Sequence, residues 1–209
     1  GPWDENMIAT SLRLGKLLHA EGIKFGAWVM CFFMQSHDPA DFGYSPSMYF
    51  SGESHAFEPS YHISFLSEKR IADITALVRR FQESEYVDMI GLDYLRTGST
   101  SGYELADEFA RTMDPERPTR FGRMSATEKQ SWLLRQRGSD DDPDVKAGFR
   151  WFRAHKIATI LERIVRDAAV SKPVWTYTLA WEAGHQHGQD PYMILDSGVS
   201  MDCVMLYES

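Results

Sequence analysis

Three carboxylates in this sequence follow directly after apolar segments: Asp93, Glu182 and Glu208. Glycoside hydrolysis needs a pair of carboxylates, because one donates a proton to the leaving oxygen while the other attacks the anomeric carbon or activates water. Arg96 lies close to Asp93 in the sequence and is expected to keep that carboxylate ionised, which suits a nucleophile or charge stabiliser. We therefore expect Asp93, Glu182 and Glu208 to be the catalytic residues of a glycosidase, a hydrolase of O-glycosyl bonds.

Aromatic and polar residues beside these carboxylates are candidates for holding a sugar. Aromatic rings offer a flat apolar surface, and tyrosine and tryptophan add a polar edge that can form hydrogen bonds. The same residue types also fill ordinary protein cores, so their type alone is a weak indication. They are candidates because they lie beside the carboxylates in the sequence. The expected substrate-binding residues are Tyr94, Arg96, Trp181, His185, His187 and Tyr207.

A second group of possible ligands lies in the segment 182–190. His185 and His187 form a His-x-His pair, and Asp190 would be a third ligand of a zinc ion. The same segment would serve equally as a hydrogen-bonding loop for a substrate, or as a plain polar loop. The leading hypothesis includes no metal and no cofactor, and a metal-dependent hydrolase that uses these three residues is kept as an alternative.

Four strands are expected to position these groups, at 23–33, 87–93, 174–181 and 203–207. Residues 23–33 are apolar on both faces, which is typical of a buried parallel strand. The carboxyl ends of parallel strands open on the same edge of a sheet. This arrangement would bring the three carboxylates together at that edge.

Amphipathic segments alternate with the strands. Helices are expected at 5–21, 67–83 and 145–169, one or two short helices within 103–137, and another short helix at 191–197. Alternating helices and buried strands indicate an α/β fold with a parallel sheet and helical cover. The segments 34–66 and 182–190 are expected to be loops.

Alternation along two of the strands is expected to turn small and polar side chains inward. Gly91 and Asp93 share one face of their strand, and Thr176, Thr178 and Glu182 share one face of theirs. Small and polar inward residues suit the narrow interior of a barrel.

The composition restricts the classes of function. The chain has 209 residues, 43% of them apolar, and a formal net charge of −8, which makes a nucleic-acid partner unexpected. No apolar stretch approaches the about 18 residues of a membrane span, and no signal peptide is recognisable. Two cysteines, Cys31 and Cys203, imply no disulfide framework. The sequence assigns no compartment.

Residues Val87 to Arg96, Val-Asp-Met-Ile-Gly-Leu-Asp-Tyr-Leu-Arg, resemble a strand of bacterial glycosyl-hydrolase-like TIM-barrel families. Residues 151–158 with 172–174 are similar to the helix and strand leading into their next catalytic-face loop, and 199–208 resembles their following strand. In those families the aspartate that matches Asp93 is the residue most often proposed as catalytic.

The resemblance covers roughly residues 10–35 and 65–208, whereas 34–64 and 103–145 depart from the family pattern. It implies one α/β domain, 1–209, with about four of the eight βα units of a TIM barrel, and so a partial barrel or a segment of one. Open sheet edges would favour self-association.

The resemblance implies a carbohydrate-metabolism enzyme with a polysaccharide or glycan as substrate. The alternatives are a non-catalytic carbohydrate-binding or scaffold barrel, and the metal-dependent hydrolase.

Overall fold

The protein is built on a four-stranded parallel sheet. The computed structural model describes residues 3–35, 37–138 and 143–206. The strand order is β1-β4-β5-β6, and every neighbouring pair is parallel. The expected α/β class with a parallel sheet is therefore confirmed. The strands are β1 (Gly26–Met30), β4 (Met89–Asp93), β5 (Val174–Leu179) and β6 (Met201–Met205).

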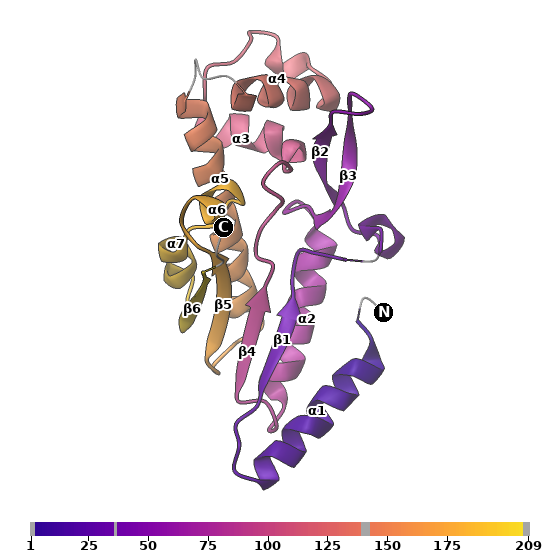
Figure 1. Cartoon of the computed structure of the whole chain (residues 1–209), viewed down its shortest axis with the longest axis vertical. Coiled ribbons are helices and arrows are strands. Elements are labelled where there is room, and N and C mark those ends of the chain that lie inside the picture. Colours follow the sequence, from indigo (N-terminus) through magenta and orange to yellow (C-terminus); the bar gives the residue numbers. More distant parts are fainter. Residues whose placement is uncertain (1–2, 36, 139–142, 207–209) are drawn as a thin grey trace.

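Long helices connect the strands and lie on one side of the sheet. Figure 1 shows α2 and α5 behind the sheet, and the two helices pack against each other. No helix in the described part of the chain is both long and apolar enough to cross a membrane. The helices that accompany the parallel sheet are α1 (Glu5–Ala20), α2 (Glu68–Glu83), α5 (Pro143–Asp167), α6 (Trp181–Gln186) and α7 (Pro191–Asp196).

A smaller group of elements lies beyond the carboxyl ends of the strands, at the top of Figure 1. It combines an antiparallel hairpin with two further helices. It lies next to the edge of the sheet where the candidate residues were expected. Its elements are β2 (Pro46–Ser51), β3 (Ala56–Ile63), α3 (Ala106–Met113), α4 (Ala126–Gly138) and the short 3-10 helices Pro39–Phe42, Tyr103–Leu105 and Phe121–Arg123.

One face of the sheet, which we call the covered face, packs against the long helices. Ile90 and Leu92 of β4 and Val29 of β1 point to this side and are fully or almost fully buried. Ile71 and Ile74 of α2 are equally buried. Burial of an aliphatic side chain contributes roughly 1.5–3 kcal/mol, so this contact holds the strands in place.

The opposite face, which we call the open face, carries Trp28, Gly91, Trp175, Tyr177 and Met201. Trp28 pairs in register with Gly91, and Gly91 with Trp175, so the three lie on the same side. A Cβ at position 91 would lie 2.2 Å from the Trp175 ring, so only glycine leaves room for that ring. Trp28 remains 50% exposed and Met201 52% exposed. No described helix crosses this face in Figure 1.

The expectation that Thr176 and Thr178 share an inward face with Asp93 is wrong. Thr176 pairs in register with Leu92 and therefore lies on the covered face. Both threonine hydroxyls are buried and donate to the carboxylate of Asp202, at 2.7 and 2.6 Å. Each strand alternates as expected, but the register between the strands places these threonines opposite to Gly91.

Two segments expected to be loops contain regular structure. The segment 34–66 forms the β2–β3 hairpin, and residues 181–186 form α6. The strand β5 ends at Leu179, so Glu182 lies on a helix and its direction does not follow from strand alternation. Gly184 lets α6 approach the end of β5, because a Cβ there would lie 2.4 Å from the Leu179 carbonyl oxygen.

Candidate functional site

Asp93 is the last residue of β4 and lies at the carboxyl end of the open face. Asp93 is 9% exposed to solvent. The Tyr94 amide donates to Asp93 Oδ1 at 2.5 Å. Within the described part of the chain, the second oxygen, Oδ2, has no hydrogen-bond partner. The carboxylate is thus held by one oxygen and has the other available for a ligand.

Tyr94 turns the chain away from the strand with a positive φ of 52°, in the left-handed region. Its ring stacks on Phe33, which follows β1, with centroids 4.7 Å apart and an angle of 9°. The Arg96 guanidinium also lies against the Tyr94 ring, 4.7 Å from its centroid. The Arg96 guanidinium forms no described ion pair with Asp93, although the sequence suggested that it would keep that carboxylate ionised; it lies against the Tyr94 ring.

His62, at the end of β3, brings the hairpin to this site. Its ring lies 5.0 Å from that of Phe33, and the two residues form an antiparallel β-bridge. Burial lowers the pKa of His62 to about 4, with smaller contributions from His187 and Arg96. The imidazole is therefore neutral at physiological pH.

His187 approaches the same place from the end of α6. Its Nδ1 lies 2.9 Å from the carbonyl oxygen of Thr97. A carbonyl only accepts, so Nδ1 carries the proton and Nε2 of the neutral ring is left with a lone pair. Burial lowers the pKa of His187, opposed by the hydrogen bond to Thr97 and reinforced by Arg96 and Arg153. Phe33, His62, Tyr94, Arg96 and His187 are called the rim cluster below.

Arg153 of α5 fixes the two loops that carry the rim cluster. This fully buried side chain donates to Thr97 Oγ1 at 2.8 Å and to the Gln186 carbonyl at 2.7 Å. It thereby ties the loop after β4 to the end of α6. Burial lowers the pKa of Arg153 to about 9, which still leaves it cationic at neutral pH.

A cavity of about 650 Å³ opens beside the rim cluster, between the hairpin and the segment after β1. It shares Phe33 and His62 with the cluster. Tyr49 and Tyr61 add two more rings to the wall, and Tyr61 is 60% exposed. The remaining lining residues are His37, Asp38, Pro39, Pro59 and Ser60.

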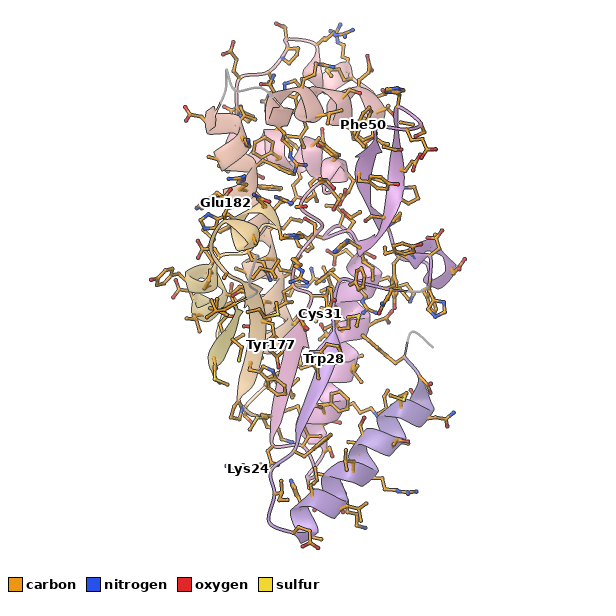
Figure 2. The ribbon with its side chains drawn as sticks, in the orientation of Figure 1. Lys24, Trp28, Cys31, Phe50, Tyr177 and Glu182 are labelled. Carbon is orange, nitrogen blue, oxygen red and sulfur yellow. The ribbon has the colours of Figure 1, made fainter. Side chains whose placement is uncertain are left out.

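Glu182 lies apart from these groups. Figure 2 shows it at α6, whereas Cys31, next to the end of β1, lies lower in the view and on the opposite side of the sheet's width. The exposed carboxylate pairs with Arg150 at 3.1 Å and accepts a hydrogen bond from Gln186. The Gln186 hydrogen bond, followed by the charge of Arg150, lowers the pKa of Glu182. A carboxylate held ionised in this way is poorly suited to act as a general acid.

The other predicted residues are also dispersed or undescribed. His185 is exposed and lines a separate cavity of about 250 Å³ between α5 and α7. Tyr207, Glu208 and the Trp181 side chain lie outside the described residues, so those three predictions remain predictions.

The three proposed zinc ligands serve different purposes. Asp190 caps the start of α7 by accepting from the amides of Tyr192 and Met193. His187 is directed to Thr97, whereas His185 faces the other cavity. Among the residues that the structure describes, no group of three or more histidine, cysteine or acidic side chains could hold a metal ion.

Comparisons with known proteins place the chain in no family. No protein-family model matches the sequence, and no curated protein matches it. The chemistry of the site therefore has to follow from its own residues.

Sequence reasoning assigned no role to Phe33 or Arg153, and left His62 ambiguous within a long loop. Phe33 belongs to an apolar run that reads as core, and Arg153 lies on the buried side of a helix. The signal that was available is the pair of β-prone runs around Gly52, which is typical of a hairpin. Recognising that hairpin would have brought His62 back to the carboxyl end of the sheet.

Proposed function

We propose that this chain is a carbohydrate-active protein of the glycoside-hydrolase type, with its site at the carboxyl end of the sheet and Asp93 as its central carboxylate. One observation carries the proposal. A largely buried carboxylate with one unengaged oxygen ends a central parallel strand, and the next residue, Tyr94, stacks on Phe33 in the aromatic wall of a cavity.

The one-sided cover of the sheet supports a barrel-type architecture. In a (β/α) barrel the helices lie outside, the inner face carries no helix, and active sites form at the carboxyl ends of the strands. Here the covered face meets α2 and α5, and Asp93 follows Gly91 on the open face. The four parallel strands would then be a segment of such a barrel.

The cavity suits a sugar ring. Phe33, Tyr49 and Tyr61 provide flat apolar surfaces, and His37 and Ser60 provide polar edges. Binding sites for small polar molecules combine apolar walls with a few polar groups that fix orientation. A sugar bound there would extend from the hairpin toward Asp93 along the stacked Phe33 and Tyr94 rings.

In the hydrolytic form of the proposal, Asp93 Oδ2 attacks the anomeric carbon or stabilises the positive charge that develops on it. A second carboxyl group must protonate the leaving oxygen. The contacts of Glu182 with Arg150 and Gln186 disfavour it for this role. Glu208 stays the predicted acid.

A second candidate is glycan binding without turnover. The observation that favours it is the pairing of Glu182 with Arg150, which leaves Asp93 as the predicted carboxylate that the described chain places at the rim. Binding needs the rings and the polar edges, but no second carboxylate.

The test replaces Asp93 with Asn, which preserves shape and removes the charge. Turnover of a panel of soluble polysaccharides and aryl glycosides is measured by reducing-end release. Loss of a catalytic carboxylate is expected to reduce the rate by about 10²–10⁴-fold. The matched control is Asp196→Asn, an exposed aspartate at the end of α7.

Three outcomes are distinguished by adding glycan binding, measured by calorimetry. Turnover that falls only in Asp93→Asn supports the hydrolase. Binding without turnover in wild type and in Asp93→Asn supports the glycan-binding candidate. Turnover that is unchanged in Asp93→Asn removes Asp93 from the mechanism.

A further inference from the structure

Arg96 has an unmet hydrogen-bonding capacity. Its Nη1 is enclosed and has no hydrogen-bond partner. Within the described part of the chain no acidic side chain forms an ion pair with it; its one described partner is the face of the Tyr94 ring. Leaving a buried donor of a charged group unpaired is costly, by about 1–3 kcal/mol or more. A ligand oxygen at Nη1 would remove that penalty.

The charged groups that act on the two histidines beside Arg96 are cationic. His62 and His187 both approach it, and Arg153 adds a further buried cation beside His187. In the free protein this environment, together with burial, keeps the two imidazoles neutral. The titratable and charged groups here are Arg96, Arg153, His62 and His187, with Asp93 at the end of β4. The buried Glu104 carboxyl, Arg137 and Arg150 also act on Arg153.

A bound anion would shift the two imidazoles from the neutral toward the protonated form. A carboxylate at Arg96 Nη1 would form a charge-assisted hydrogen bond, which is about twice as strong as a neutral one. Its negative charge would also favour protonation of the nearby imidazoles. Nε2 of His187 would then change from an acceptor into a donor, because Nδ1 already donates to Thr97.

We propose that the carbohydrate bound at this site carries a carboxylate, as a uronic acid does, and that Arg96 with His62 and His187 recognises it. This inference rests on the proposed function and specifies its substrate class. The whole chain has a net charge of −8, so two arginines close together with no described ion pair to Arg96 stand out from the rest of the molecule. The Phe33 and Tyr94 rings would hold the apolar face of the same sugar.

The probes are acidic oligosaccharides and their neutral methyl esters, which differ only in the charge of the carboxyl group. Oligomers of galacturonate, mannuronate and glucuronate are each compared with their own ester by calorimetry. At least one acid is expected to bind about 10- to 100-fold more tightly than its ester, the range for one charged hydrogen bond. Esters that bind as tightly as every acid overturn the proposal.

Protonation provides a test that needs no variant. The ligand carboxylate stays ionised above about pH 4, so proton uptake on binding reports the histidines. Acid binding is expected to tighten as the pH falls from about 7.5 to about 5.5, with an enthalpy that depends on the ionisation heat of the buffer. Affinity that does not change across this range, with no proton uptake, contradicts the role of the imidazoles.

Two variants locate the effect. Arg96→Gln is expected to abolish the preference for acid over ester, and Arg96→Lys to keep part of the preference. The matched control is Arg13→Gln, an exposed arginine on α1 at the opposite end of the molecule. Circular dichroism confirms that each variant is folded. A full preference in folded Arg96→Gln overturns the assignment.

Small anions separate a sugar site from a simple anion site. Acetate or sulfate that displaces the uronide at equal concentration would show an anion site without sugar recognition, and would overturn the proposal. If neutral glycans are bound or cleaved through Asp93 but no acid is preferred, the proposed function stands and this inference fails. If no glycan is bound or cleaved, both fail.

Discussion

At the amino end of the parallel sheet, two aspartates each accept two hydrogen bonds from the protein itself. Asp88, just before β4, accepts hydrogen bonds from the Phe25 amide and from His19, each at 2.7 Å. Asp202, in β6, accepts from two buried threonine hydroxyls of β5. The Phe25 hydrogen bond, followed by that of His19, lowers the pKa of Asp88.

At the carboxyl end of the same sheet, polar groups are left incomplete. Asp93 accepts one described hydrogen bond, from the amide of the next residue, Arg96 Nη1 is enclosed without a partner, and His62 is partly buried in its neutral form. The difference shows that a carboxylate on a strand gives no indication of its role by itself. Satisfied groups stabilise the fold, and unsatisfied groups at one edge mark a site.

The largest expected effect on stability is at Asp202. Asp202→Ala leaves the buried hydroxyl of Thr178 without its acceptor and leaves that of Thr176 with only the longer contact to the Met201 carbonyl at 3.4 Å. Each unsatisfied group costs about 1–3 kcal/mol. The free energy of unfolding is therefore expected to fall by roughly 2–5 kcal/mol, measured by urea denaturation. Asp196→Ala is the control. A fall no larger than that of the control would remove the distinction between the two ends.

The next effect is the pH dependence that His62 introduces. Its pKa is 6.5 in an ordinary environment and about 4 in the folded protein, so the native state resists its protonation. The contribution to stability is complete above about pH 6.5 and is lost as the pH falls toward about 4, by up to about 3 kcal/mol. His187 acts in the same direction.

Urea denaturation of wild type and His62→Gln over this pH range measures that loss. The wild-type curve is expected to be steeper, because the glutamine has no proton to gain. His155→Gln, an exposed histidine on α5, is the control. Parallel curves for wild type and His62→Gln would show that the rim cluster does not hold a buried neutral imidazole.

The smallest effect compares one substitution at the two ends of β4. Asp93→Asn is expected to change the free energy of unfolding by less than about 1 kcal/mol, because it removes an incompletely paired charge. Asp88→Asn is expected to destabilise more, since it weakens two hydrogen bonds that favour the ionised form. Equal losses in both variants, measured by thermal unfolding, would contradict the comparison.

The central elements could be predicted from the sequence because their signals are local. The apolar runs that become β4 and β5, and the spacing of Ile71, Ile74 and Phe81 in α2, indicate buried strands and an amphipathic helix. The α6 helix is too short to produce a period and contains Gly184. It forms because that glycine permits close contact with the end of β5.

The candidate site was predictable only in part. Asp93, Tyr94 and Arg96 share one strand end, so their proximity follows from the chain itself. His62 and His187 join them through a hairpin turn and a strand register that single-sequence patterns do not determine. For the same reason Thr176 and Thr178 were predicted to lie on the wrong face: the sequence does not give the register between the strands.

The half-exposed indole of Trp28 gives the open face an optical readout. An indole in water emits at longer wavelengths than one in an apolar environment, and iodide reaches it by collision. In a Trp28→Phe variant, the lost emission would come from the red, quenchable part of the spectrum. The difference between the two spectra thus reports the solvent exposure of this side of the sheet.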